Sequence, residues 1–342
     1  MTTQLNTLFV TAENARVHKE GETLVVRIEH QVRVRVPLLH LAGLVVLSPA
    51  WVSPDAMHAL VEQGAGVSFL SPTGKFLARV EGLPGGSVHV RRAQFRAAES
   101  ADRSLDISRS MVGGKVCNAR TLLQRAAREA DGEREVLLSA AVEELLRRLR
   151  EVERADNLDS LRGVEGLAAR QYWEVFDALV KKQREGFRFG GRSRRPPGDR
   201  INALLSFGYA LLMHDCVTGC GVAGLDPAVG FLHEDRPGRL SLALDLMEEL
   251  RVPVVDRLVL ALINREQLRA SDLVEDPVGG WSLTKEGRKT FFIAWQEAKQ
   301  DSVNHPFLDQ DTTYQRLPTL QAMLLARHLR GDVDKYPPFL LR

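Results

Sequence analysis

One imidazole and three carboxylates, between residues 165 and 248, have the types and spacing for metal-assisted phosphodiester chemistry. Glu165 lies in GVEG, His233 in GFLHED, and Asp245 and Glu248 in LDLMEELR. Nitrogen and oxygen donors in this mixture suit a hard divalent cation, Mg²⁺ or Mn²⁺, that keeps open positions for water. Such an ion activates an attacking oxygen and stabilises a leaving one.

Glu165 belongs to an apolar helical stripe. The periodicity predicts a helix beginning near Val164, on which Ala168, Ala169 and Tyr172 share the face of Glu165. One interpretation is a first-turn glutamate favoured by the helix dipole. The other is a carboxylate directed into the core, where it needs a cation or hydrogen bonds to offset desolvation.

The acidic helix predicted over Leu240–Leu250 carries Asp245, Glu248 and Glu249 at spacings that project to a common side. These residues form either a solvated acidic face or, with a divalent ion, a binding site. His233, in the loop before this helix, is either an ordinary polar residue or a ligand, depending on its spatial neighbours.

A short basic segment gives the second line of argument. Residues 181–200 hold eight Lys or Arg against two acidic residues, a local charge of +6 in a chain of net charge +2. Cations here are expected to contact a phosphate backbone, and Phe187 and Phe189 to stack on an unpaired base. The alternative is an exposed, flexible loop that only adds solubility. The candidate DNA contacts are Lys181, Lys182, Arg192, Arg194 and Arg195.

Several other classes of protein are disfavoured. The Gly-Gly pairs lack the spacing of a Walker phosphate loop, and neither a GxSxG elbow nor an HExxH pair occurs. The three cysteines form no disulfide framework and are expected to be reduced core residues. With no signal peptide and no apolar run long enough to span a bilayer, a cytoplasmic protein without membrane association is expected.

The elements that must position these residues fall into two predicted domains. Period-two patterns predict a small β-rich domain with one helix, over residues 1–96. Within it, Gln31–Val36 is predicted as a half-buried strand and Val88–Arg92 as the last strand. Helical periodicity then dominates residues 97–342. The predicted fold class is α+β, with an N-terminal β-rich domain followed by an all-α metal-binding catalytic domain. Helices are predicted over Leu122–Arg154, Val164–Lys181, Ile201–Gly219, Leu240–Leu250, Val254–Asn264, Thr284–Ala298 and Tyr314–Arg330.

Taken in order, the motifs resemble one family of proteins over nearly the whole chain. The matching segments are GVEGLAARQYW, DRINALLSFGYALL, GLDPAVGFLH, RLSLALDLMEELRVPVVDRLVL and LQAMLLARHLRG, with NTLFVTAENARVHKEGETLVV near the N-terminus. They resemble the CRISPR-associated integrases and endonucleases that capture new spacers, particularly the form found in type I-C systems.

The resemblance implies specific roles. Glu165, His233 and Glu248 match the catalytic metal ligands for Mg²⁺ or Mn²⁺, and Asp245 matches an auxiliary acidic position near the metal. Asn202 and Tyr209 match supporting positions. The implied reaction is attack of the 3′-hydroxyl of captured DNA on a repeat phosphodiester, with double-stranded and branched DNA as substrates. The implied assembly is a homodimer, with a small ferredoxin-like partner protein bridging two dimers.

Two other functions are kept as alternatives. A non-catalytic DNA-binding scaffold would use its acidic helix structurally and show no strand transfer that depends on a divalent ion. A small-molecule metallohydrolase would need an enclosed apolar pocket, and it would leave the basic segment unexplained.

Overall fold

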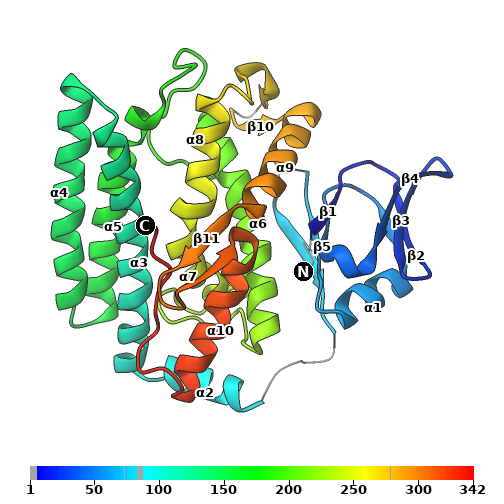
Figure 1. Cartoon of the computed structure of the whole chain (residues 1–342), viewed down its shortest axis with the longest axis horizontal. Coiled ribbons are helices and arrows are strands. Elements are labelled where there is room, and N and C mark those ends of the chain that lie inside the picture. Colours follow the sequence, from blue (N-terminus) through cyan, green and yellow to red (C-terminus); the bar gives the residue numbers. More distant parts are fainter. Residues whose placement is uncertain (1–5, 73, 83–87, 278) are drawn as a thin grey trace. The chain divides into compact units, whose positions relative to one another are not determined.

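The chain folds into two compact units, Met1–Gly85 and Gly86–Arg342, which are described separately. The structure is a computed structural model, and it describes residues 6–72, 74–82, 88–277 and 279–342 (Figure 1). The boundary lies before the expected position between residues 96 and 97.

The first unit contains two four-stranded sheets and one helix, α1. One sheet has the order β1-β5-β7-β8, in which β1, β5 and β7 run parallel and β8 is antiparallel to β7. The other has the order β4-β3-β2-β6. The bounds are β1 Asn6–Val10, β2 Arg16–Glu20, β3 Thr23–Ile28, β4 Gln31–Pro37, β5 Leu41–Val46, β6 Trp51–Val52, α1 Pro54–Glu62, β7 Gly66–Leu70 and β8 Phe76–Val80.

Apolar residues from both sheets and α1 form the core of the first unit, including Leu24, Leu44 and Leu60. The β-rich prediction for this region is confirmed. The half-buried interpretation of Gln31–Val36 is wrong, because Val32 and Val34 are 41% and 37% exposed. This strand lies at a sheet edge and pairs only with β3 among the described strands. Its valines and its arginines are both largely exposed, so neither face of the strand is buried.

The second unit is mainly helical. Its helices are α2 Val88–Ala98, α3 Ala101–Arg128, α4 Gly132–Arg154, α5 Leu158–Glu174, α6 Arg200–Ala223, α7 Ser241–Leu250, α8 Arg257–Asn264, α9 Lys285–Gln300 and α10 Leu317–Arg330, with a π-helical stretch over Arg251–Asp256. In Figure 1, α3, α4 and α5 pack side by side, with α7 next to α3. Two hairpins, β9 Leu273–Glu275 with β10 Trp281–Leu283 and β11 Ser302–His305 with β12 Gln310–Thr313, make the unit helical but not all-α.

The segment predicted as the last strand, Val88–Arg92, is the first turn and a half of α2. The β-branched valines suggested a strand, but a tertiary contact favours the helix. Gln94 is buried and its amide nitrogen donates to the carbonyls of Asp226 and Val229, both at 2.8 Å. The helix therefore belongs to the second unit, which explains the earlier boundary.

The helix bearing Glu165 begins earlier than predicted. Asn157 caps α5 by accepting from the backbone of Ser160 at 2.8 Å, so Glu165 lies in the helix interior. The first-turn interpretation of Glu165 is therefore wrong. The predicted helix Leu122–Arg154 is also two helices, because the chain turns after Arg128 and Gly132 adopts a φ of +54°.

The most apolar helix, α6, is long and apolar enough to cross a membrane by length and composition. However, 72% of its apolar window is buried inside the protein. It therefore packs as a core helix of the second unit, and its C-terminus at Gly224 takes the left-handed conformation common at helix ends.

Candidate metal centre

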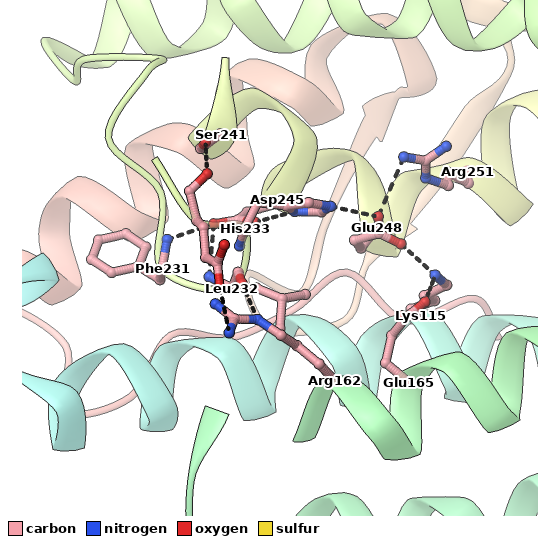
Figure 2. A network of polar contacts seen from close by, with 11 residues as sticks. Lys115, Arg162, Glu165, Phe231, Leu232, His233, Ser241, Asp245, Glu248 and Arg251 are labelled. Carbon is pink, nitrogen blue, oxygen red and sulfur yellow. Dashed lines mark hydrogen bonds and ion pairs between the residues drawn. The ribbon is translucent and has the colours of Figure 1, made fainter. Parts of the chain in front are cut away.

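The second unit gathers the predicted ligands from three places in the chain. Glu165 comes from α5, Glu248 from α7, and His233 from the loop that precedes α7 (Figure 2). A cationic side chain that was not predicted, Lys115 of α3, lies between the two glutamates. Helix packing thus brings Lys115 and Glu248 together, although more than a hundred residues separate them in the sequence.

Asp245 organises the loop that carries His233. Its carboxylate is fully buried and accepts from the backbone N–H groups of Phe231, Leu232 and His233 at 2.6, 3.1 and 3.0 Å. It also lies 2.6 Å from His233 Nδ1. When Nδ1 donates to this carboxylate, Nε2 keeps its lone pair, which is the usual arrangement of a metal-binding histidine. Asp245 therefore fixes both the backbone of this loop and the orientation of the His233 ring.

The close approach of this loop to α7 depends on Gly230. A Cβ atom there would lie 2.7 Å from the Cβ of Ser241 and 2.9 Å from Asp245 Oδ2, too close for either contact. Arg162 of α5 fixes the loop from the other side, because its Nε donates to the carbonyl of Leu232 at 2.9 Å. His233 is therefore held by α5 as well as by α7.

Glu248 has a charged neighbour at each oxygen. Oε1 lies 3.3 Å from the Arg251 guanidinium and 4.0 Å from His233 Nε2, and Oε2 lies 2.5 Å from Lys115 Nζ. Burial would raise the pKa of Glu248, but Arg251, Lys115 and His233 together hold it well below its ordinary value. The carboxylate is therefore an anion at neutral pH.

Lys115 links the glutamates of α5 and α7. Its ammonium forms an ion pair with Glu165 as well as with Glu248, and its side chain is 18% exposed. Burial would lower the pKa of Lys115, but the carboxylates of Glu248 and Glu165 outweigh burial and raise it. Lys115 is therefore charged at neutral pH.

The adjacent Gly114 lets α3 approach α7. A Cβ on Gly114 would lie 2.7 Å from the Cβ of Pro338 and 3.2 Å from the Cβ of Glu249. Asn118, one turn on, is buried and donates to the backbone carbonyl of Glu249 at 2.7 Å. Lys115 shares a helix face with the buried Met111 and Ala119, so its side chain points from α3 towards the protein interior.

The three acidic residues of α7 do not form a solvated face. Asp245, Glu248 and Glu249 are all buried, so that alternative is wrong. Glu249 has its own set of partners, which does not include Glu165, His233 or Lys115. It accepts from Gln321 at 2.9 Å, from the backbone N–H of Phe339 at 2.6 Å and from the hydroxyl of Tyr336. Burial raises the pKa of Glu249 to about 7, although these hydrogen bonds oppose the shift.

The donor set fits a divalent cation chemically, since it combines two carboxylates with an imidazole nitrogen. Among the described residues, no group of three His, Cys, Asp or Glu side chains lies close enough together to hold an ion. Instead, Glu165 and Glu248 are arranged around an ammonium group, which shows that this position favours positive charge.

A buried polar cluster of Asp256, Tyr172 and Tyr209 lies next to Arg251, the partner of Glu248. Asp256, in the π-helical stretch, accepts from the hydroxyls of Tyr172 at 2.8 Å and Tyr209 at 2.5 Å. Burial raises the pKa of Asp256 to about 6, although both hydroxyls oppose the shift. Arg251 lies 4.8 Å from the centre of the Tyr209 ring while it pairs with Glu248. Tyr209 thus contacts both Asp256 and the guanidinium that pairs with Glu248.

The aromatic residues of the basic segment do not face solvent. Phe187 and Phe189 are 1% and 8% exposed, and Phe189 packs against Trp173 and Phe176 at ring-centre distances of 5.6 and 5.0 Å. The expectation that they stack on an unpaired base is therefore wrong. These two rings anchor the segment in the core, while most of its other residues remain partly or fully exposed.

The five candidate DNA contacts divide into two kinds. Arg192 is directed into the protein, where it donates to Asn202 at 2.7 Å and to Ser206 at 3.1 Å. Asn202 is fully buried and also accepts from the backbone of Ser193 at 3.0 Å, so this pair fixes the segment. The other four candidates are exposed: Lys181, Lys182, Arg194 and Arg195. Lys181 also forms an ion pair with Glu129 at 2.5 Å.

Comparison with known proteins identifies relatives over the full length of the chain. Residues 8–297 match the family model described as CRISPR associated protein Cas1. The chain is 48% identical over 340 residues to CRISPR-associated endonuclease Cas1 2 of Rhodospirillum rubrum, covering 98% of each. It is 43% identical over 346 residues to CRISPR-associated endonuclease Cas1 1 of Chlorobaculum tepidum, covering 100% of each.

Two solved structures share the fold at lower sequence identity. A casposase bound to its integration product has a TM-score of 0.83 and 24% identity, over 97% of this chain and 92% of that one. A Cas6-RT-Cas1–Cas2 complex contains a chain with a TM-score of 0.80 and 22% identity, over 100% of this chain and 36% of that one. Both likenesses concern the fold.

Proposed function

Because this chain belongs to the CRISPR-associated Cas1 family, we propose that it is a metal-dependent DNA endonuclease and integrase of spacer acquisition. The reaction would insert a short captured DNA into a CRISPR array through attack of its 3′-hydroxyl on a repeat phosphodiester. The observation that carries the proposal is the arrangement of Glu165 and Glu248 around one cation, with His233 Nε2 lying 4.0 Å from the other oxygen of Glu248.

The proposed ligands of Mg²⁺ or Mn²⁺ are the carboxylates of Glu165 and Glu248 and the Nε2 atom of His233. A divalent ion bound there supplies the Lewis acidity that phosphodiester transfer and hydrolysis require. Asp245 would hold the His233 ring so that Nε2 faces Glu248, and Arg251 would keep the Glu248 carboxylate ionised and in place. Positioning and charge stabilisation are the protein's part in such a reaction.

The proposed substrates are double-stranded and branched DNA. The basic segment is anchored by its own aromatic residues, and four of its cationic side chains are exposed to solvent: Lys181, Lys182, Arg194 and Arg195. Contacts of such residues with phosphates would bind DNA of any sequence and weaken with salt. Arg192 is left out of this set because its guanidinium bonds within the protein.

The proposed assembly is a cytoplasmic homodimer, two of which are bridged by a small ferredoxin-like partner protein. Its support is the family resemblance together with the fold shared with a chain of a Cas1–Cas2 complex. The assignment to type I-C systems also rests on the resemblance alone.

The test of this function is a paired substitution. His233→Ala should abolish strand transfer and cleavage of branched DNA in the presence of Mn²⁺, while leaving DNA affinity within about twofold of wild type. Replacement of Asp235, an exposed acid two residues on, by Asn is the matched control and should leave both properties unchanged.

A non-catalytic scaffold is the second candidate, and the ion pairs of Lys115 with Glu165 and Glu248 are the observation in its favour. A scaffold would show no strand transfer at any concentration of Mg²⁺ or Mn²⁺. Equal loss of DNA affinity and of strand transfer in His233→Ala would also count against a catalytic role for this residue.

A further inference from the structure

Lys115 occupies the place between two of the side chains proposed to bind the divalent ion. One ammonium group pairs with Glu165 and also lies 2.5 Å from Glu248 Oε2 (Figure 2). These are the two carboxylates proposed to bind the divalent ion. An ammonium is a compact point charge, and it neutralises part of the repulsion between neighbouring carboxylates.

A divalent ion and this ammonium cannot share the same carboxylate oxygens. Two like charges at about 4 Å repel by about 4 kcal/mol at an effective dielectric constant of 20, and the double charge of the ion doubles this. Oε1 of Glu248 is already next to the Arg251 guanidinium, 3.3 Å away. Ion binding therefore requires that one of the two cationic side chains withdraws.

Lys115 is the cation that is able to withdraw. Arg251 is on the same helical turn as Glu248, three residues further on, and packs over the Tyr209 ring at 4.8 Å. Lys115 reaches the site from a different helix on a flexible four-carbon stem, and its side chain retains 18% exposure to solvent. Rotation of that stem would release both carboxylates together.

We propose that Lys115 is a tethered counter-ion that pairs Glu165 with Glu248 until a divalent cation displaces it. This inference rests on the proposed metal centre. The exchange holds the ligands near one another in the metal-free protein, and it lowers the apparent affinity for the ion. A competitor that fills the position nine times in ten weakens binding about tenfold.

The test measures Mn²⁺ binding directly, by calorimetry and by the electron paramagnetic resonance signal of free Mn²⁺, without DNA. Lys115→Met keeps the length of the stem and removes the charge. It should bind Mn²⁺ about tenfold more tightly than wild type, and its melting temperature should be lower without metal and rise more when Mn²⁺ is added. Lys115→Arg keeps the charge in a larger, planar group and should bind Mn²⁺ no more tightly than wild type.

The control is Lys299→Met, which removes a buried lysine paired with Asp215 at 2.7 Å outside the centre. It should lower the melting temperature without changing Mn²⁺ affinity. Equal or weaker Mn²⁺ binding by Lys115→Met than by wild type would overturn the exchange while leaving the metal centre intact. If neither wild type nor Lys115→Met bound Mn²⁺, the metal centre itself would fail. Should Lys115→Met not fold, tighter binding by Lys115→Gln would support the proposal and unchanged binding would overturn it.

Discussion

Replacement of Asp245 by Asn gives a sharp test of how the His233 loop is held. The carboxylate accepts from four donors: the backbone N–H groups of Phe231, Leu232 and His233, and Nδ1 of the His233 ring. An asparagine side chain has a single oxygen, so one pair of donors must face an NH₂ group instead. Its bonds also lose the strength that a charged acceptor gives.

The cost follows from these contacts. Each hydrogen bond to a charged group contributes about 1.5–3 kcal/mol, and two are lost at a fully buried position. Asp245→Asn should therefore lower the free energy of unfolding by about 3–6 kcal/mol. The amide protons of residues 231–233 should also lose their protection from hydrogen exchange. Strand transfer should fall by about 10- to 100-fold, as is typical when the partner of a metal-binding histidine is removed.

The assay combines urea unfolding followed by circular dichroism with hydrogen exchange of the loop amides at pH 7. Asp235→Asn, on the exposed part of the same loop, should change stability by less than about 0.5 kcal/mol. If Asp245→Asn behaved like this control, with protected amides and normal strand transfer, the role assigned to the carboxylate would be refuted.

Three further predictions concern helix packing, pH and DNA. Gly114→Ala should destabilise the protein by about 1–3 kcal/mol, because its Cβ would clash with Pro338 and crowd Glu249 of α7. Gly113→Ala, whose Cβ would have nothing within 4 Å, should not, and thermal unfolding distinguishes the two variants. Burial lowers the pKa of His214 from its ordinary 6.5 to about 4, so its stabilising contribution is complete above pH 6.5 and is lost as pH falls towards 4. His214→Gln should therefore reduce the drop in unfolding free energy over that range by about 3 kcal/mol, and a slope unchanged from wild type would contradict this. Arg194→Ala combined with Arg195→Ala should weaken DNA binding equally for all sequences and reduce its logarithmic salt slope by about two, with an unchanged melting temperature.

The residue types of the candidate centre were predictable from the sequence, and their neighbours were not. Glu165, His233 and Glu248 could be singled out by chemistry and by family resemblance. The pairing of Glu165 with Glu248 through Lys115 depends on how closely α3 packs on α7, which Gly114 permits. A contact of that kind is set by tertiary packing, and no local periodicity encodes it.

Sequence patterns also failed where tertiary contacts outweigh local preference. Phe187 and Phe189 stand among arginines, which indicates an exposed segment, yet both rings are buried because the aromatic cluster of Trp173 and Phe176 lies nearby. Val88 and Val90 favour a strand, yet the buried contacts of Gln94 require a helix. The β-rich character of the first unit was predicted correctly, because period-two patterns mark its short strands.

The two neighbouring carboxylates of α7 project to different sides of the helix and have different partners. Glu248 faces the cationic position, and Glu249 binds the segment that contains Tyr336 and Phe339. Because a helix is stiff, the hydrogen bonds of this segment to Glu249 contribute to fixing the rotation of α7 about its own axis, and with it the direction of the Glu248 side chain. Substitutions in residues 336–341 should therefore alter catalysis indirectly, by reorienting Glu248, a proposed metal ligand.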